Sequence, residues 1–299
     1  MTILAVRAGG ALRGAARLDQ PLGDPWGQDD ETSRFSAAER AQERSAGPLV
    51  PAGTVPLVLL HAFPLSSAMW GPVLADLPEL PVLAIDLPGA GFSPTVQPVS
   101  IRAAGLAVIE SLAELGVTRA VIGGISMGGY VAMSVIKDAP ELLAGAILMH
   151  TKAVADDPAT RAGRLETARQ VLHAGSTELL APMASKMVSA ASQIIHPGLV
   201  ETIEHWIDQA TPGGMAWAEE AMAGRDDAMG TLRACGLPVT IMAGAADPFA
   251  TVRQAEEMAD AVGHSANLAV LSEIAHLSPL EAPNMTSRIV RESYRRMVD

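Results

Sequence analysis

The sequence predicts an α/β protein built on a mostly parallel, twisted sheet with helices on both faces. Three observations carry this prediction. Short apolar runs alternate with helical patterns, which is typical of βαβ units and parallel strands. Most of these runs are apolar at successive positions, as expected for strands that are covered on both faces. The chain has 299 residues, of which 49% are apolar and 18% charged, so it can bury a large core.

The expected strands are the apolar runs themselves. They are VPLVLLH at 55–61, PVLAID at 81–86, RAVIGG at 119–124, AGAILMH at 144–150, LPVTIMAG at 237–244 and ANLAVL at 266–271. Two of the intervening helices have clear end signals. Ser100 precedes one helical pattern and Gly116 follows it, while Thr251 and Gly263 bracket another. We expect both as surface helices on the sheet.

Two segments interrupt the alternation. Residues 24–53 are rich in charge, proline, glycine and serine without an apolar period, which predicts a flexible loop, and residues 2–20 before it are a candidate edge hairpin. The second interruption is a pattern of about four helices between two strands, which predicts an inserted lid. The expected parts are an N-terminal segment at 1–53, a core in two pieces at 54–150 and 234–299, and a helical lid at 151–233.

Composition narrows the class of partner. A formal net charge of −12 and a pI near 5.0 argue against nucleic acid and anionic membranes, which would repel the protein, and favour a small molecule. Cys235 is the single cysteine, so an internal disulfide is excluded. No apolar run approaches a membrane span, and arginines interrupt the start of the chain where a secretory signal would be apolar. We expect a cytoplasmic protein, and the sequence leaves its oligomeric state open.

The stretch GGISMGGY at 123–130 raises the question of chemistry. By chance alone, G-x-S-x-G should arise in roughly one such sequence in seven, so its context must decide. Here the motif follows an expected strand and opens a helical pattern, which is the strand–turn–helix setting of a nucleophile elbow. Ser126 is therefore the candidate nucleophile. The alternative is a glycine-rich turn with a capping serine.

A serine nucleophile needs a histidine base and an orienting carboxylate, which follow it in the chain in this architecture. Asp247 follows an expected strand and His276 lies in a turn after the last one, so both belong at the carboxyl edge of the sheet. Asp156 and Asp157 are the rivals for the acid. His61 and His150 end strands and are expected to hydrogen-bond to nearby loops. No histidine or cysteine cluster has metal-ligand spacing, so no metal is expected.

Five blocks occur in the order LHAFPLSSAMW, DLPGAGFS, GGISMGGYVA, GAADP and AHLSPLEAP. In this order they resemble the α/β-hydrolase superfamily, especially its small esterase, lactonase and cofactor-free haloperoxidase-like branch. The resemblance covers 54–150 and 235–296 and implies an α/β-hydrolase fold without a cofactor. It also implies that the backbone N–H groups of Phe63 and Met127 form an oxyanion hole. Ala62 stands where many members have glycine, which narrows the loop without removing an N–H.

These roles predict a serine hydrolase that cleaves a small carboxylic ester or lactone through an acyl-enzyme. The lid resembles nothing with comparable specificity, so the substrate is not transferred with the fold. A candidate substrate pocket is formed by His61, His150, Met183, Met187 and Trp206, although the lid residues also fit the lid's own core. A carbon–carbon bond hydrolase or a perhydrolase would use the same triad. The alternative of another class is a small-molecule receptor or stress-signalling protein with slow turnover.

Overall fold

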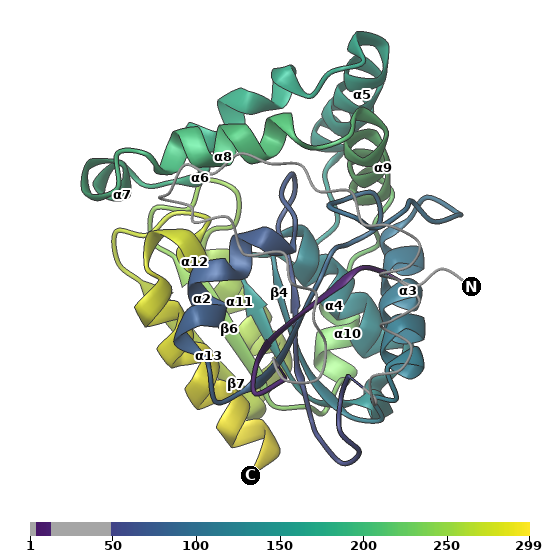
Figure 1. Cartoon of the computed structure of the whole chain (residues 1–299), viewed down its shortest axis with the longest axis vertical. Helices are drawn as coiled ribbons and strands as arrows, with labels where there is room; N and C mark the ends of the chain where they lie inside the picture. The colour runs from purple at the N-terminus through teal and green to yellow at the C-terminus, as the bar shows by residue number, and fades with distance from the viewer. Residues whose placement is uncertain (1–3, 13–48) are drawn as a thin grey trace, which may run out of the picture.

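A computed structural model describes residues 4–12 and 49–299 of the chain. Its centre is a seven-stranded sheet with the strand order β1-β3-β2-β4-β5-β6-β7 (Figure 1). The strands are β1 (Val6–Gly10), β2 (Leu57–Leu60), β3 (Pro81–Ile85), β4 (Ala120–Ile125), β5 (Leu143–Met149), β6 (Val239–Gly244) and β7 (Ala266–Leu271). All neighbouring pairs are parallel except β1 with β3, which is antiparallel. The predicted mostly parallel sheet is confirmed.

The central strands are buried along their whole lengths, as their uninterrupted apolar sequences require. Helices cover both faces of the sheet. One layer consists of α3 (Ile101–Glu114), α4 (Met127–Asp138), α10 (Met229–Ala234) and α11 (Val252–Val262). The other consists of α2 (Gly71–Asp76), α12 (Ser278–Glu281) and α13 (Pro283–Val298). Short 3-10 turns complete the core at η2 (Ser67–Trp70), η3 (Pro140–Leu142) and η5 (Gly263–Ser265).

The predicted helix starts coincide with side-chain caps. The Ser100 hydroxyl accepts a hydrogen bond from the N–H of Ala103 at 3.0 Å, which satisfies a free donor in the first turn of α3. At α11, Thr251 and Gln254 form a reciprocal capping box. These local interactions explain why the ends of both helices can be found from sequence.

The N-terminal segment contributes one edge strand to the sheet. β1 pairs with β3 from Val6 opposite Ile85 to Gly10 opposite Pro81. The second half of the predicted edge hairpin at 2–20 lies outside the described residues. The same holds for most of the loop predicted at 24–53, of which the structure describes only residues 49–53.

A helical insertion connects β5 to β6 and lies above the carboxyl edge of the sheet (Figure 1). Its elements are α5 (Pro158–Ala174), η4 (Glu178–Met183), α6 (Ala184–Met187), α7 (Ala190–Ile195), α8 (Leu199–Asp208) and α9 (Pro212–Ala223). The prediction of about four helices between these strands is therefore too low, because six α-helices, including α10, separate them. α10 packs against α4 and α11, so the predicted lid boundary at 233 falls inside a helix of the layer beside the sheet.

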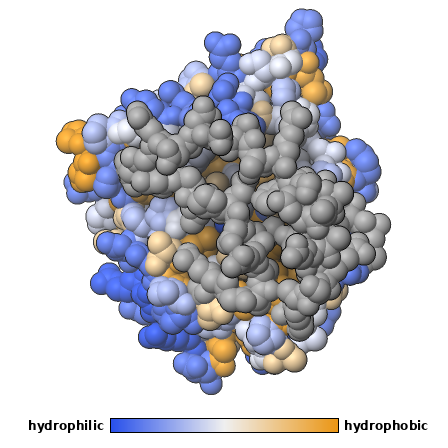
Figure 2. All heavy atoms as spheres, in the orientation of Figure 1, coloured by the Kyte–Doolittle hydropathy of each residue, from blue (hydrophilic) through white to orange (hydrophobic). Residues whose placement is uncertain are grey.

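The insertion exposes apolar side chains on its surface at α7. Ile194 and Ile195 are 82% and 69% exposed, and Figure 2 shows apolar side chains gathered at this end of the molecule. Among the described residues, no helix combines the length and the apolar character that crossing a membrane requires.

Buried charges join the two ends of the insertion, and one of them contacts the core. Asp156 pairs with Arg164 of α5 at 2.7 Å and with Arg225 at 2.5 Å, and Arg164 also pairs with Glu219 of α9 at 2.8 Å. The Arg225 guanidinium in turn lies 4.2 Å from the ring centroid of Tyr130 in α4, a cation–π contact. Burial alone would raise the pKa of Asp156, but hydrogen bonds from Arg225 and Arg164 lower it to about 2.

Candidate active site

Ser126 lies between the end of β4 and the start of α4, in a backbone conformation that serine rarely adopts. Its φ is 53° and its ψ is −115°. Such a positive φ is costly for a residue with a Cβ and persists only where the surroundings enforce it. A Cβ on Gly124 would collide with the carbonyl of Gly128, and one on Gly128 with the carbonyl of Leu60. The glycines of the motif are therefore needed because β2, β4 and α4 approach one another closely here.

The backbone of Ser126 is held on several sides. Its N–H donates to the carbonyl of Met149 at 2.9 Å, and its carbonyl accepts a hydrogen bond from the Thr151 hydroxyl at 2.8 Å. The Ser126 side-chain hydroxyl forms no hydrogen bond with any described residue. This arrangement fixes the backbone and leaves the hydroxyl available at the N-terminus of α4.

Asp247 and His276 meet although 29 residues separate them. Asp247 follows β6 and His276 follows β7, and His276 Nδ1 lies 2.8 Å from Asp247 Oδ2. The other carboxylate oxygen, Oδ1, accepts backbone hydrogen bonds from Phe249 at 2.8 Å and Ala250 at 3.1 Å. Phe249 also packs edge-on against the His276 ring, with 5.0 Å between centroids. These contacts orient the imidazole.

A second histidine, His150, reaches the same carboxylate oxygen. Its Nδ1 lies 3.3 Å from Asp247 Oδ2, and its side chain is fully buried. Burial alone would raise the pKa of Asp247, but hydrogen bonds from His150 and His276 hold that pKa below its ordinary value. Asp247 is therefore ionised near neutral pH. The sequence interpretation placed His150 against a nearby loop or in the substrate pocket and missed this contact, because the partner lies 97 residues away.

The two backbone N–H groups predicted to form an oxyanion hole belong to Phe63 and Met127. Phe63 follows β2 and Met127 follows Ser126, and the neighbouring Gly128 N–H donates to the carbonyl of His61 at 3.1 Å. That hydrogen bond joins the two segments. Within the part of the chain that the structure describes, neither the Phe63 N–H nor the Met127 N–H has an acceptor, so both donors are free for a ligand.

His61 is bound to backbone on both sides of its ring. Its Nε2 accepts from the N–H of Leu87 at 2.9 Å, so its Nδ1 must carry the proton donated to the carbonyl of Ala62, also at 2.9 Å. Burial lowers the pKa of His61 and favours this neutral form. His61 thus joins the loops after β2 and β3, and its role in a substrate pocket stays a prediction.

The three pocket residues predicted in the insertion have different environments. Met187 is buried, and its carbonyl accepts the backbone N–H of His276 at 3.1 Å. Met183 and Trp206 are half-buried and pack against the apolar core. Met187 is therefore beside the candidate base, and a substrate-pocket role for all three residues stays a prediction.

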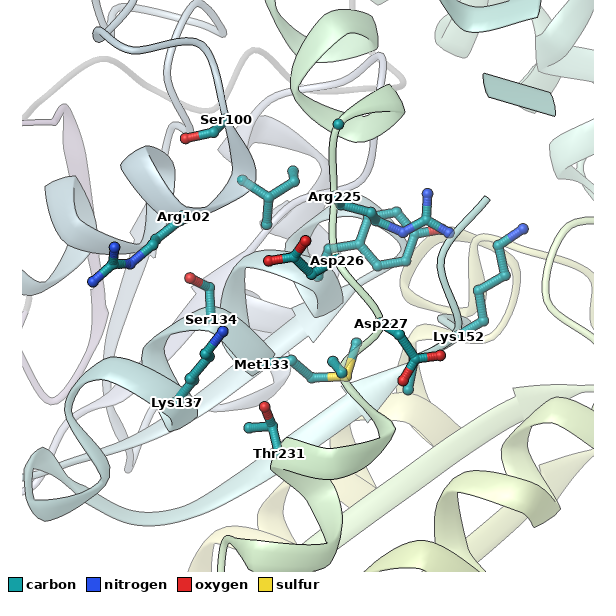
Figure 3. A pocket seen from close by; sticks show the side chains of 15 residues that line it. Ser100, Arg102, Met133, Ser134, Lys137, Lys152, Arg225, Asp226, Asp227 and Thr231 are labelled. Atoms are coloured by element: carbon teal, nitrogen blue, oxygen red, sulfur yellow. The ribbon is translucent and has the colours of Figure 1, made fainter. Parts of the chain in front are cut away.

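The rival acids are occupied elsewhere. Asp156 belongs to the buried charge network of the insertion, and Asp157 caps the first turn of α5. The charge network borders a pocket of about 120 Å³ between α3, α4 and residues 224–228 (Figure 3). Lys152, Ser134, Asp226 and Asp227 are among the residues that line it. None of Ser126, Asp247 and His276 lines it.

Glu281 organises the loop that carries His276, and the sequence interpretation did not single it out. Its Oε1 accepts backbone hydrogen bonds from Ala275 and Leu277, both at 3.1 Å. These are the residues on either side of His276. The only local signal was a glutamate five residues after a candidate base, which does not by itself predict such a role.

Within the described residues, one group could supply three metal ligands, namely His150, Asp247 and His276. Their ligand atoms lie within 4.8 Å of one another. The two hydrogen bonds to Asp247 Oδ2 account for this proximity, and a metal ion would have to replace them. The hydrogen bonds from the two histidines to Asp247 are sufficient to explain why these three side chains lie together.

A model of the alpha/beta hydrolase family matches residues 57–285, which is most of the chain. The chain belongs to the α/β-hydrolase family. Ser126, Asp247 and His276 follow β4, β6 and β7 in this order along the chain. The 3-oxoadipate enol-lactonase 2 of Acinetobacter baylyi is 30% identical over 216 residues, covering 72% of this chain and 79% of that protein.

Solved structures of α/β-hydrolases resemble this one over most of both chains. A thermophilic esterase from Thermogutta terrifontis superposes with a TM-score of 0.79 and 30% identity, covering 83% of this chain and 92% of the esterase. The enol-lactonase from Burkholderia xenovorans has a TM-score of 0.73 at 23% identity, with 82% and 93% coverage, and shows the shared fold.

Proposed function

We propose that this protein is a serine hydrolase that cleaves a small carboxylic ester or lactone through an acyl-enzyme. The observation that carries the proposal is the Asp247–His276 hydrogen bond at the same sheet edge as the strained Ser126. The relatives named above as an esterase and an enol-lactonase support this substrate class.

The reaction begins when Ser126 Oγ attacks the carbonyl carbon and His276 Nε2 takes the hydroxyl proton. Asp247 holds the His276 Nδ1–H, so Nε2 carries the lone pair that accepts this proton. The carbonyl oxygen becomes an oxyanion that accepts hydrogen bonds from the N–H groups of Phe63 and Met127. His276 then donates the proton to the leaving alkoxide, and an acyl-Ser126 ester remains.

Water completes the cycle. His276 Nε2 accepts a proton from the water as it attacks the acyl carbon, and returns that proton to Ser126 Oγ when the acid leaves. The insertion acts as a lid in this scheme. In this lid, the carbonyl of Met187 accepts the backbone N–H of His276. The lid is therefore hydrogen-bonded directly to the candidate base.

One observation favours a second function, a small-molecule receptor that turns over slowly and then binds a protein. Ile194 and Ile195 on α7 expose apolar surface on the insertion, which is the surface a partner would contact. The enzyme is the better supported function because the candidate nucleophile Ser126 and the hydrogen-bonded pair of Asp247 and His276 follow β4, β6 and β7 at one edge of the sheet.

A panel of p-nitrophenyl esters of increasing acyl length, together with simple lactones, tests the proposal. We expect multiple turnovers of at least one short-chain ester, lost in Ser126→Ala. Absence of turnover across the whole panel by a folded wild-type protein would remove the ester and lactone hydrolase assignment.

A further inference from the structure

Asp247 is shared between two histidines, and this sharing determines where the protons are. An ionised carboxylate only accepts hydrogen bonds, so each Nδ1 that contacts Oδ2 must carry a hydrogen. With the two backbone donors on Oδ1, Asp247 receives four hydrogen bonds. Neutral His150 is therefore in the same Nδ1–H tautomer as His276, with a bare Nε2.

His150 occupies its position at a cost to stability. Its φ is 45°, and its buried Nε2 has no hydrogen-bond partner among the described residues. Backbone strain and an unsatisfied buried polar atom each cost about 1–3 kcal/mol. A buried apolar side chain would avoid the second cost, so packing alone does not explain a histidine here. The contact with Asp247 does.

The end of β5 also connects the other parts of the site. The backbone N–H of His150 donates to Met242 of β6 at 2.8 Å, and the adjacent Thr151 hydroxyl donates to the carbonyl of Ser126. Two consecutive residues thus contact the segments that carry the nucleophile and the acid. A change at His150 therefore acts on the relative positions of both.

Charged and titratable groups surround His150 from three elements. They are Asp247 after β6, His276 after β7 and Glu281 in α12. The His150 and His276 rings meet edge to face, with 6.1 Å between centroids. Burial lowers the pKa of His150, so it remains neutral while it donates to the carboxylate. Tyr130 of α4 is a further titratable group that interacts electrostatically with Asp247.

We propose that His150 is a positioning residue that shares the Asp247 carboxylate with His276. His150 fixes the orientation of this carboxylate and reduces the negative charge that acts on His276, the candidate base. A carboxylate that serves two donors stabilises an imidazolium less than one that serves a single donor. This inference rests on the proposed hydrolase function.

The test compares His150→Leu with His150→Asn. Leucine removes the donor, whereas the asparagine amide can replace Nδ1–H and asparagine tolerates a positive φ. In His150→Leu we expect the midpoint of the acid limb of kcat/KM to rise by about 0.5–1 pH unit and kcat to fall about tenfold with little change in KM. His150→Asn should keep the wild-type midpoint. His264→Leu, an exposed histidine at the opposite edge of the sheet, is the matched control.

A wild-type profile in His150→Leu would overturn the proposal. Equal losses in His150→Leu and His150→Asn, with no shift of the midpoint, would reduce His150 to a packing role and also overturn it. Thermal melts establish that each variant is folded. If the leucine variant does not fold, the asparagine variant and the following measurement decide.

Proton NMR of the full-length wild-type protein with ¹⁵N-labelled histidine provides a readout that needs no turnover. We expect downfield Nδ1–H resonances from His61, His150 and His276. The His150 resonance should disappear in His150→Asn, and the His150 and His276 resonances should both move in Asp247→Asn. Resonances from His61 and His276 alone would contradict the shared carboxylate. The His150 and His276 resonances in a protein that hydrolyses no ester would instead support the shared carboxylate and remove the hydrolase function.

Discussion

The carboxylate of Glu281 accepts the backbone N–H of Ser189 at 2.8 Å, across 92 residues of sequence. Ser189 belongs to the insertion, whereas Glu281 holds the loop that carries His276. Together with the hydrogen bond from the His276 N–H to the Met187 carbonyl, this contact makes the insertion part of the support of the candidate base. The insertion and the proposed catalytic loop are therefore mechanically connected.

Replacing Glu281 should affect both stability and activity. In Glu281→Gln the amide nitrogen cannot accept a hydrogen bond, so at least one buried N–H at Ala275, Leu277 or Ser189 loses its acceptor. We expect a loss of about 1–3 kcal/mol in the free energy of unfolding, measured by urea denaturation, and a reduced kcat. The exposed Glu256→Gln should change neither. If Glu281→Gln were destabilised but kept the wild-type kcat, the hydrogen bonds of Glu281 would not support the candidate base.

The strained turn at Ser126 requires glycine at position 128. A Cβ on Gly128 has no space beside the Leu60 carbonyl, so Gly128→Ala must push β2 and α4 apart. We expect a destabilisation of about 3 kcal/mol or more, together with loss of ester hydrolysis. Gly163→Ala in α5 meets open space and should be neutral or stabilising by up to about 1 kcal/mol. Similar melting temperatures for the two variants would contradict the close approach at the elbow.

The buried charge network predicts acid sensitivity. The pKa of Asp156 is lowered to about 2 from an ordinary 3.8, so its stabilising contribution is present above about pH 4 and is lost as the pH falls toward 2. Asp247, whose pKa is also lowered, acts in the same direction. In Asp156→Asn, we expect a loss of about 3 kcal/mol at pH 7, because two arginines lose their buried partner.

Denaturant titrations at several pH values check this prediction. The free energy of unfolding of Asp156→Asn should depend less steeply on pH between about 4 and 2 than that of the wild type. Asp260→Asn, at an exposed position of α11 whose side chain forms no hydrogen bond or ion pair with a described residue, should keep the wild-type slope. Parallel curves for the wild type and Asp156→Asn would show that Asp156 does not titrate with folding.

Covalent labelling and turnover separate the two proposed functions. A fluorophosphonate should label the wild type and not Ser126→Ala, because activation of the hydroxyl serves attack at phosphorus as well as at carbon. The exposed Ser185→Ala should label normally. Turnover at about 1–1000 per second on a suitable ester identifies an enzyme. A burst of one equivalent followed by near silence would favour the receptor.

Triad variants check that the residues act as one unit. Ser126→Ala, His276→Ala and the double variant should each lose turnover to a similar extent, since removing one member disables the whole proton transfer. Additive losses in kcat would indicate that His276 and Ser126 act independently. Intact melting temperatures are required for this comparison.

Much of this protein is encoded locally, and that part could be predicted from the sequence. The apolar runs predict strands because burial on both faces leaves no polar alternation, and β2, β4, β5 and β6 are fully buried. Ser100 and Thr251 predict helix starts because a cap bonds within three residues of itself. The elbow at Ser126 is likewise encoded by five consecutive residues, G-x-S-x-G at 124–128.

The tertiary structure decided what depends on contacts between distant segments. The short helices α6 and α7 have too few turns to show a period, so the number of helices in the insertion was underestimated. His150 and Glu281 acquire their partners at separations of 97 and 92 residues. A side chain's neighbours across strands are set by sheet order and register. No local pattern in the sequence carries that information.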